Sequence, residues 1–249
     1  MQRHSIVQLG FSLFELSVVL VIVGLLSSGL MLAVAVQQDV AANSQARNQL
    51  DNAADALLGF AVRHGRLPCP GAPTGSGEES PVGGGNCSHP WNGFLPGITL
   101  GILPVNEQGH AIDPWGNPIR YVVSTVTHPA CGATPCLSSE NGLQNAWNSE
   151  IKPTLDLHVC NSAKDSSVGH NAECAAGRLL TRDAAAVIFS LGKNGKQAAT
   201  SEDESSNQNN DRLFVAHDLT AAPSEFDDQV SWVSANILYS RLLAAGRLP

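Results

Sequence analysis

The sequence has few charged residues and no run of basic ones. Lys, Arg, Asp and Glu make up 14% of the 249 residues, and the formal net charge is −8 at pH 7. An acidic chain without a basic patch does not attract a polyanion, so we expect no nucleic-acid partner. The hydrophobic content of 43% is typical of a folded chain rather than a disordered one.

The common catalytic and phosphate-binding motifs are also missing. The sequence contains no G-x-S-x-G nucleophile elbow, no H-E-x-x-H zinc motif, no P-loop and no G-x-G-x-x-G. The eight histidines are scattered along the chain. We therefore expect no enzyme, and a membrane-anchored periplasmic hydrolase stays only as an alternative.

Proline is absent from residues 1–67, which favours a long helix. The run from Leu16 to Val36 is uncharged and long enough to cross a bilayer.

After this run, apolar residues recur on one helical face, at Leu50, Ala54, Leu57, Leu58 and Ala61. Gly65 and Pro68 then indicate the end of the helix. We predict a helix over residues 11–64, roughly 80 Å long at about 1.5 Å per residue. Residues 11–36 would be its transmembrane or filament-core half, and 37–64 its amphipathic half.

One carboxylate, Glu15, stands at the start of this apolar run, where a charge needs a cation or a hydrogen bond. The stretch GFSLFE, Gly10 to Glu15, resembles the prepilin peptidase site of type IV pilins and type II secretion pseudopilins. The resemblance implies cleavage after Gly10, removal of a leader of residues 1–10, and N-methylation of Phe11. It also implies that Glu15 pairs with the terminal amine of a neighbouring subunit and sets the register of assembly.

Three other interpretations fit this segment less well. Ala33-Val34-Ala35 resembles a signal-peptide cleavage site, but the apolar core is too long and Glu15 is badly placed for that class. A plain membrane anchor would make no use of Gly10, Phe11 or Glu15. A glutamate at the lipid headgroup boundary would carry no function. Many pilins have a proline where this chain has Leu32, so we expect no proline kink.

Six cysteines follow the apolar run, an even number that favours an oxidising compartment and disulfides. Sequence alone does not fix their connectivity. Short intervening loops favour pairing between neighbours: Cys69 with Cys87, Cys131 with Cys136, and Cys160 with Cys174. Zinc binding by His158, Cys160, His170 and Cys174 is the alternative, although the cysteines lack C-x-x-C spacing.

The remaining sequence predicts a head of loops and short strands. Residues 65–118 are rich in Gly and Pro, which predicts loops. The phrase DPWGNPIRY, Asp113 to Tyr121, resembles a turn of the major pseudopilins that leads into a strand, with Trp115 as a packing anchor. We predict strands at 119–126, 155–160, 185–191 and 213–216.

An acidic stretch suggests a cation site. IFSLGKNGK, residues 188–196, resembles the strand and turn that precede a calcium-binding loop in the major pseudopilins. The following residues offer hard oxygen donors of the kind that Ca²⁺ takes: Glu202, Asp203, Glu204 and Asp211. We name Asp203 and Asp211 as candidate calcium ligands. The acids lack EF-hand spacing, so we favour a solvated acidic loop without a cofactor and keep the calcium site as the alternative.

The C-terminal stretch predicts a final helix. Asp227 or Asp228 would cap it, and an apolar stripe would follow at Val230, Val233, Ile237 and Leu238. Gly246 would end it.

These observations predict an α+β, pilin-like fold: a long N-terminal helix packed on an antiparallel sheet, with a disulfide-bridged head over residues 65–249. The implied function is that of a structural subunit of a type IV pilus or type II secretion pseudopilus. Its expected partners are other pilin or pseudopilin subunits, the prepilin peptidase and the inner membrane. The chain would cross that membrane once with a periplasmic head, and then join a filament or reach the cell surface. Its size suggests a minor or tip subunit, and a pilin-like binding or adhesion module is the rival function.

Overall fold

The computed structural model describes residues 12–167, 169, 172–199, 201–221 and 225–249, without the side chains of residues 27–36. The chain divides into two units, one ending at Ser44 and one comprising Gln45–Pro249. Gly10 and Phe11, the predicted processing residues, lie outside the described part.

Helix α1 comprises Leu13–His64. At its start, Ser12 and Glu15 form a reciprocal cap. The Ser12 hydroxyl accepts a hydrogen bond from the Phe14 amide (3.3 Å), and the Glu15 carboxylate accepts one from the Ser12 amide (3.4 Å). At its end, Gly65 adopts a left-handed φ of 69° and its amide donates to the Ala61 carbonyl (2.8 Å). The predicted helix stop at Gly65 is confirmed.

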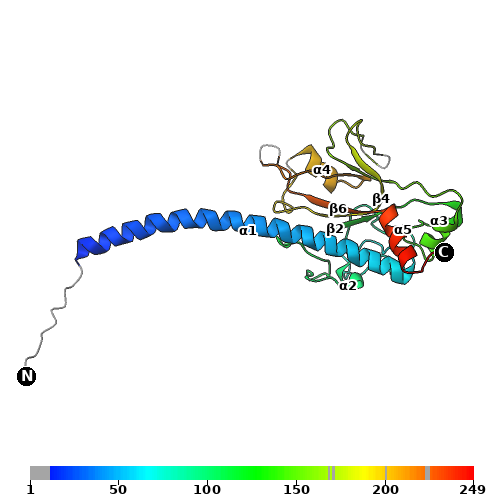
Figure 1. Cartoon of the computed structure of the whole chain (residues 1–249), viewed down its shortest axis with the longest axis horizontal. Coiled ribbons are helices and arrows are strands. Elements are labelled where there is room, and N and C mark those ends of the chain that lie inside the picture. The colour runs from blue at the N-terminus through cyan, green and yellow to red at the C-terminus, as the bar shows by residue number, and fades with distance from the viewer. Residues whose placement is uncertain (1–11, 168, 170–171, 200, 222–224) are drawn as a thin grey trace, which may run out of the picture. The chain divides into compact units, whose positions relative to one another are not determined.

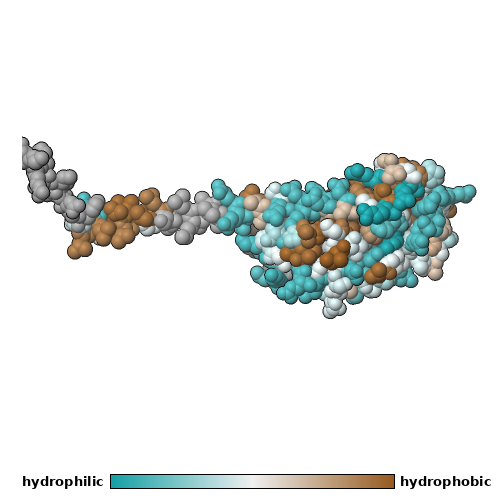
Figure 2. Space-filling model, turned by 90° about the horizontal axis from the view of Figure 1, so that it is seen from below, coloured by the Kyte–Doolittle hydropathy of each residue, from teal (hydrophilic) through white to brown (hydrophobic). Residues whose placement is uncertain are grey.

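The first turns of α1 expose their apolar side chains. Leu13 and Phe14 are 89% and 77% exposed, and exposed apolar residues continue to Leu26, as the brown stretch in Figure 2 shows. Within the described residues, no helix combines the length and the hydropathy needed to span a membrane. The predicted membrane run extends over residues 27–36, whose side chains are not described, so it stays a prediction.

In the second unit, the described strands form one sheet around β4 (Figure 1). The strands are β1 (Gly93–Phe94), β2 (Arg120–Val123), β3 (Leu157–Cys160), β4 (Leu179–Ser190), β5 (Leu213–Val215) and β6 (Gln229–Ser234). Strand β4 pairs antiparallel with β2, β3 and β6, and β1 pairs antiparallel with β2. However, β5 pairs parallel with β3, so the sheet is mixed and the expectation of a purely antiparallel sheet is wrong.

The second half of α1 packs on one face of this sheet. Leu50, Leu57 and Ala61 are at most 3% exposed and share a core cluster with Tyr121 and Ile188. The predicted apolar stripe is thus confirmed as core packing. A second cluster, which includes Val187, Phe189 and Phe214, lies on the other face, where the rings of Phe189 and Phe214 are 5.5 Å apart.

Short helices connect the strands of the second unit. They are α2 (Gly97–Leu100), the 3₁₀ turn η1 (Pro129–Cys131), α3 (Gly142–Asn148), α4 (Glu202–Gln208) and α5 (Ala235–Ala244). Helix α4 stands where the sequence predicted an acidic loop. Its start is capped by the Ser201 hydroxyl, which accepts from the Glu204 amide at 3.2 Å.

The predicted C-terminal helix begins later than expected. Residues 229–234 form β6, and α5 is capped by Ser234 rather than by Asp227 or Asp228. Pairing with β4 accounts for the difference, because it buries Val233 and satisfies backbone groups along QVSWVS. The predicted stop is confirmed: Gly246 has a φ of 66°, and its amide donates to the Leu243 carbonyl at 3.0 Å.

All six cysteines form the disulfides predicted between neighbours, Cys69–Cys87, Cys131–Cys136 and Cys160–Cys174. The zinc alternative is wrong, since no thiolate remains to bind a metal. The mixed α+β class with disulfide-bridged loops is confirmed.

A buried ion pair that the sequence did not reveal joins the first disulfide loop, through Glu79, to Arg66 just before it. Arg66 and Glu79 are each about 6% exposed and make two hydrogen bonds of 2.7 and 2.6 Å. The Glu79 carboxylate accepts further bonds from the amides of Cys69 (3.0 Å) and Gly83 (3.2 Å). Burial alone would raise the pKa of Glu79, but these bonds and the Arg66 charge bring it below its ordinary value.

Candidate metal centre

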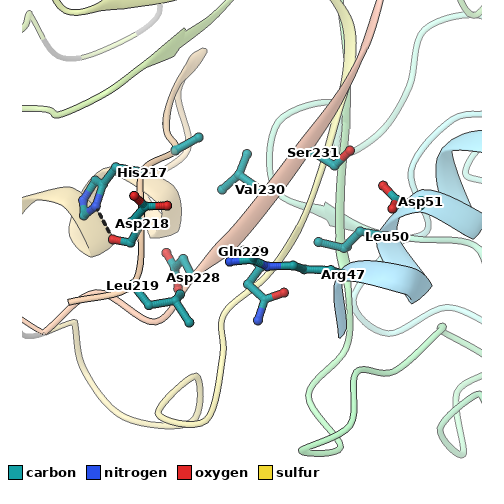
Figure 3. A pocket seen from close by; sticks show the side chains of 11 residues that line it. Arg47, Leu50, Asp51, His217, Asp218, Leu219, Asp228, Gln229, Val230 and Ser231 are labelled. Carbon is teal, nitrogen blue, oxygen red and sulfur yellow. Dashed lines mark hydrogen bonds between the residues drawn. The ribbon is translucent and has the colours of Figure 1, made fainter. Parts of the chain in front are cut away.

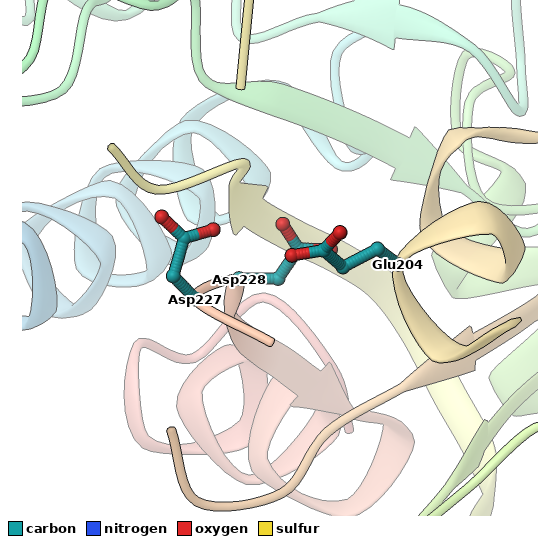
Figure 4. A group of neighbouring side chains, drawn as sticks. All are labelled: Glu204, Asp227 and Asp228. Carbon is teal, nitrogen blue, oxygen red and sulfur yellow. The ribbon is translucent and has the colours of Figure 1, made fainter. Parts of the chain in front are cut away.

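Among the described residues, one group of carboxylates is close enough to hold an ion together. Glu204, Asp227 and Asp228 each place an oxygen within 4.8 Å of the others. Figure 4 shows the carboxylates of Glu204 and Asp228 side by side, with Asp227 on the same segment as Asp228. Glu204 comes from α4, and the two aspartates immediately precede β6. We call this group the acidic triad.

The turn after β4 positions two members of the triad. The Asn194 side-chain amide donates to the Glu204 carboxylate (3.0 Å), and the Asn194 backbone amide donates to the Asp227 carboxylate (3.0 Å). Glu204 is fully buried. Asn194 therefore holds side chains from two separate segments at one point.

Glycine is required in this turn because the chain passes very close to Asp227. A Cβ atom on Gly192 would lie 2.4 Å from the Asp227 carboxyl carbon and backbone oxygen, and the φ of Gly192 is 64°. The Gly192 carbonyl accepts a hydrogen bond of 2.6 Å from the Asn117 side chain. The predicted DPWGNP turn thus has a structural role beyond its own strand: it supports the turn that carries the triad.

Asp228 is held from the other side by Asn207 of α4. The Asn207 side chain donates to one Asp228 carboxylate oxygen (2.9 Å) and also bonds the backbone amide (2.7 Å) and carbonyl (3.0 Å) of Val215. The second carboxylate oxygen of Asp228 is buried and has no hydrogen-bond partner among the described residues. Because an unsatisfied buried oxygen is destabilising, this atom needs a partner, which a proton, a water molecule or a cation can supply.

The electrostatics of the triad agree with that requirement. Burial, opposed by the Asn207 bond and reinforced by the charges of Glu204 and Asp227, raises the pKa of Asp228 to about 8. Burial also raises the pKa of Asp227, against hydrogen bonds from Asn194 and Lys193. Without a cation, Asp228 is therefore largely protonated at neutral pH.

Three carboxylates with an unsatisfied oxygen suit a hard divalent cation. Ca²⁺ and Mg²⁺ take oxygen ligands, and Ca²⁺ accepts irregular geometry and mixed carboxylate, carbonyl and water ligands. A bound cation would supply the positive charge that the triad lacks and would favour the ionised form of Asp228.

The structure gives the predicted calcium ligands other partners. Asp203 accepts hydrogen bonds from the Ser162 hydroxyl (3.1 Å) and the Ala163 amide (2.6 Å) and contacts His217 at 3.3 Å. Asp211 accepts from the Leu213 amide at 2.9 Å. Neither belongs to the triad, and their choice as a joint calcium site stays a prediction.

Of the triad, only Glu204 was among the acids that the sequence singled out. Asp227 and Asp228 were interpreted as a helix cap, because they precede an apolar pattern that fits a helix as well as a strand. The one feature of the sequence that could have indicated Asp227 and Asp228 as metal ligands is that two acids stand side by side at the start of that pattern.

No protein-family model, curated protein or solved structure matches this chain.

Proposed function

We propose that the chain is a structural subunit of a type IV pilus or type II secretion pseudopilus, processed after Gly10 and assembled through its N-terminal helix. The observation that carries the proposal is the order of features at the N-terminus. GFSLFE stands immediately before an uncharged run, and α1 begins at Leu13 within the motif. A removable polar leader followed by a retained apolar helix is the arrangement that the family uses.

Glu15 has two roles in this proposal. Its carboxylate accepts a hydrogen bond from the Ser12 amide and so caps α1 within one chain. Its negative charge in the first turn also interacts favourably with the helix dipole. Cleavage after Gly10 would create an amine at Phe11. In a filament, that amine on a neighbouring subunit would be the cation for Glu15, and the apolar side chains from Leu13 to Leu26 would be covered by other helices.

We further propose that the acidic triad binds Ca²⁺ and locks α4, the turn after β4 and the start of β6 together. The buried, unsatisfied oxygen of Asp228 supports this assignment. A bound ion would stiffen the surface of a head that must withstand secretion and packing. The groove described below supports the rival function, that of a binding or adhesion head.

The assembly step is tested by replacing Glu15 in the full chain and recovering filaments sheared from cells. We expect Glu15→Leu to reduce incorporation at least about tenfold while cleavage continues, because an unpaired amine in an apolar assembly is strongly unfavourable. Asp39→Asn, which removes another acid from α1, is the matched control and should assemble normally. Normal incorporation of the Glu15→Leu chain would overturn the register role.

A further inference from the structure

A groove runs between α1 and β6 in the second unit. One of its two cavities, about 330 Å³, lies between α1 residues Arg47, Leu50 and Asp51 and the segments 216–219 and 228–231 (Figure 3). The other, about 320 Å³, is lined by α1 residues 51–58, by 231–233 and by two residues of α5. Asp51 and Ser231 line both cavities, so the two are adjacent, and we call them together the α1–β6 groove.

The wall of the groove formed by β6 has an unpaired backbone edge. Within the described part of the chain, β6 pairs only with β4, and Val230–Val233 make no backbone hydrogen bond to a loop or turn. Edge strands are normally protected by charged residues or proline. The β6 sequence, QVSWVS, has neither. An unprotected edge of this kind is a template for pairing with another strand.

The side chains of β6 leave apolar surface for such a strand to cover. Val230 and Trp232 are only partly buried at the rim of the second core cluster. Val233, whose side chain alternates with theirs, is buried against the first cluster. A strand added beside β6 would extend the sheet and bury the exposed parts of Val230 and Trp232.

The charge of the groove determines which partner segments it would favour. Asp51 and Asp218 are exposed at the groove and make no side-chain hydrogen bond or ion pair among the described residues, whereas Asp55 is paired with Arg241 at 3.5 Å. Arg47 is the one remaining cation among the described groove residues. The groove is thus acidic, and it favours a basic segment over an acidic one.

We propose that the α1–β6 groove binds an extended segment of a partner polypeptide that pairs its backbone with β6 and carries Lys or Arg toward Asp51 and Asp218. The inference rests on the second unit alone. It is therefore independent of the N-terminal processing motif, although Asp228 of the triad also lines the first cavity.

The test uses the full chain in detergent micelles and a blocked hexapeptide, acetyl-Lys-Val-Lys-Val-Thr-Val-amide, at concentrations up to about 1 mM. We expect saturable binding and slower hydrogen exchange of the Val230–Ser234 amides. A peptide with the same side chains but with N-methyl groups on alternate backbone amides should not bind, because it cannot complete the strand pairing.

Matched variants test how much the charges of Asp51 and Asp218 contribute to peptide binding. Asp51→Asn and Asp218→Asn should each weaken binding about threefold, and the loss should shrink at high salt. Asp183→Asn removes an exposed acid on β4 outside the groove and should bind as the unaltered chain does. The proposal is overturned by equal binding of the N-methylated peptide, by no binding at the highest concentration, or by protection of β6 through self-association without peptide.

Discussion

Two carboxylates in the second unit are both buried but lie in opposite electrostatic surroundings. Glu79 is 6% exposed and lies against the Arg66 guanidinium, which helps to bring its pKa below the ordinary value. Asp228 is 2% exposed and faces two other acids, and its pKa rises to about 8. The difference shows that burial alone does not decide ionisation. Neighbouring charges and hydrogen bonds also count: Arg66 and backbone amides favour the charged form of Glu79, whereas two acids disfavour that of Asp228.

The largest expected effect comes from removing the built-in cation. Arg66→Met leaves a buried, uncompensated Glu79, and we expect the free energy of unfolding to fall by about 3–5 kcal/mol. Chemical denaturation measures it. Adding Glu79→Leu to the same chain should restore most of the loss, because no charge then remains buried. A double variant as unstable as Arg66→Met alone would show that packing, not charge, is responsible.

Adding Ca²⁺ is the matching experiment at the triad. Ca²⁺ at about one hundred times its dissociation constant should raise the free energy of unfolding by about 2.7 kcal/mol, and a chelator should reverse the gain. Asp228→Asn should abolish the response, whereas Asp203→Asn should retain it. The opposite pattern would assign the ion to Asp203 and contradict the acidic triad as its site.

In the presence of a chelator, the free energy of unfolding should depend on pH with opposite signs at the two sites. The pKa of Glu79 is lowered from 4.5, so its stabilisation is present above that value and is lost on acidification. The pKa of Asp228 is raised from 3.8 to about 8, so the folded state keeps a proton that the unfolded state has lost. Stability should therefore fall between about pH 5 and 8, by up to about 1.4 kcal/mol per pH unit.

Denaturation curves in chelator across this range check the pH effect. Asp228→Asn, which needs no proton, should flatten the curve, while Asp203→Asn should leave it unchanged. An unaltered slope in the Asp228→Asn chain would show that Asp228 does not carry the proton.

Local signals in the sequence predicted the features that depend on neighbours in the chain. The disulfide partners lie close in sequence, as with Cys131 and Cys136, and Gly65 ends α1 through its own backbone conformation. In contrast, β6 was mistaken for helix because Val230, Val233 and Ile237 fit a helical spacing as well as a strand. Only its pairing with β4 decides between the two.

The buried acids were harder to find because their partners are distant or lie in loops. Glu204 and Asp228 are brought together by Asn194 and Asn207, which no local pattern indicates. Arg66 and Glu79 meet inside a Gly- and Pro-rich segment that the sequence presents only as a loop. Both groups of buried acids are formed by tertiary contacts and not by a local sequence motif.

The central claim is that this chain is a processed filament subunit, and the mass and N-terminal sequence of the mature protein test it most directly. The chain should be isolated from cells that contain a prepilin peptidase. We predict a protein that begins at Phe11 with one methyl group on its terminal amine, and an uncleaved chain when the peptidase is absent. A mature protein that begins at Met1 or at Val36 in the presence of the peptidase would contradict the account.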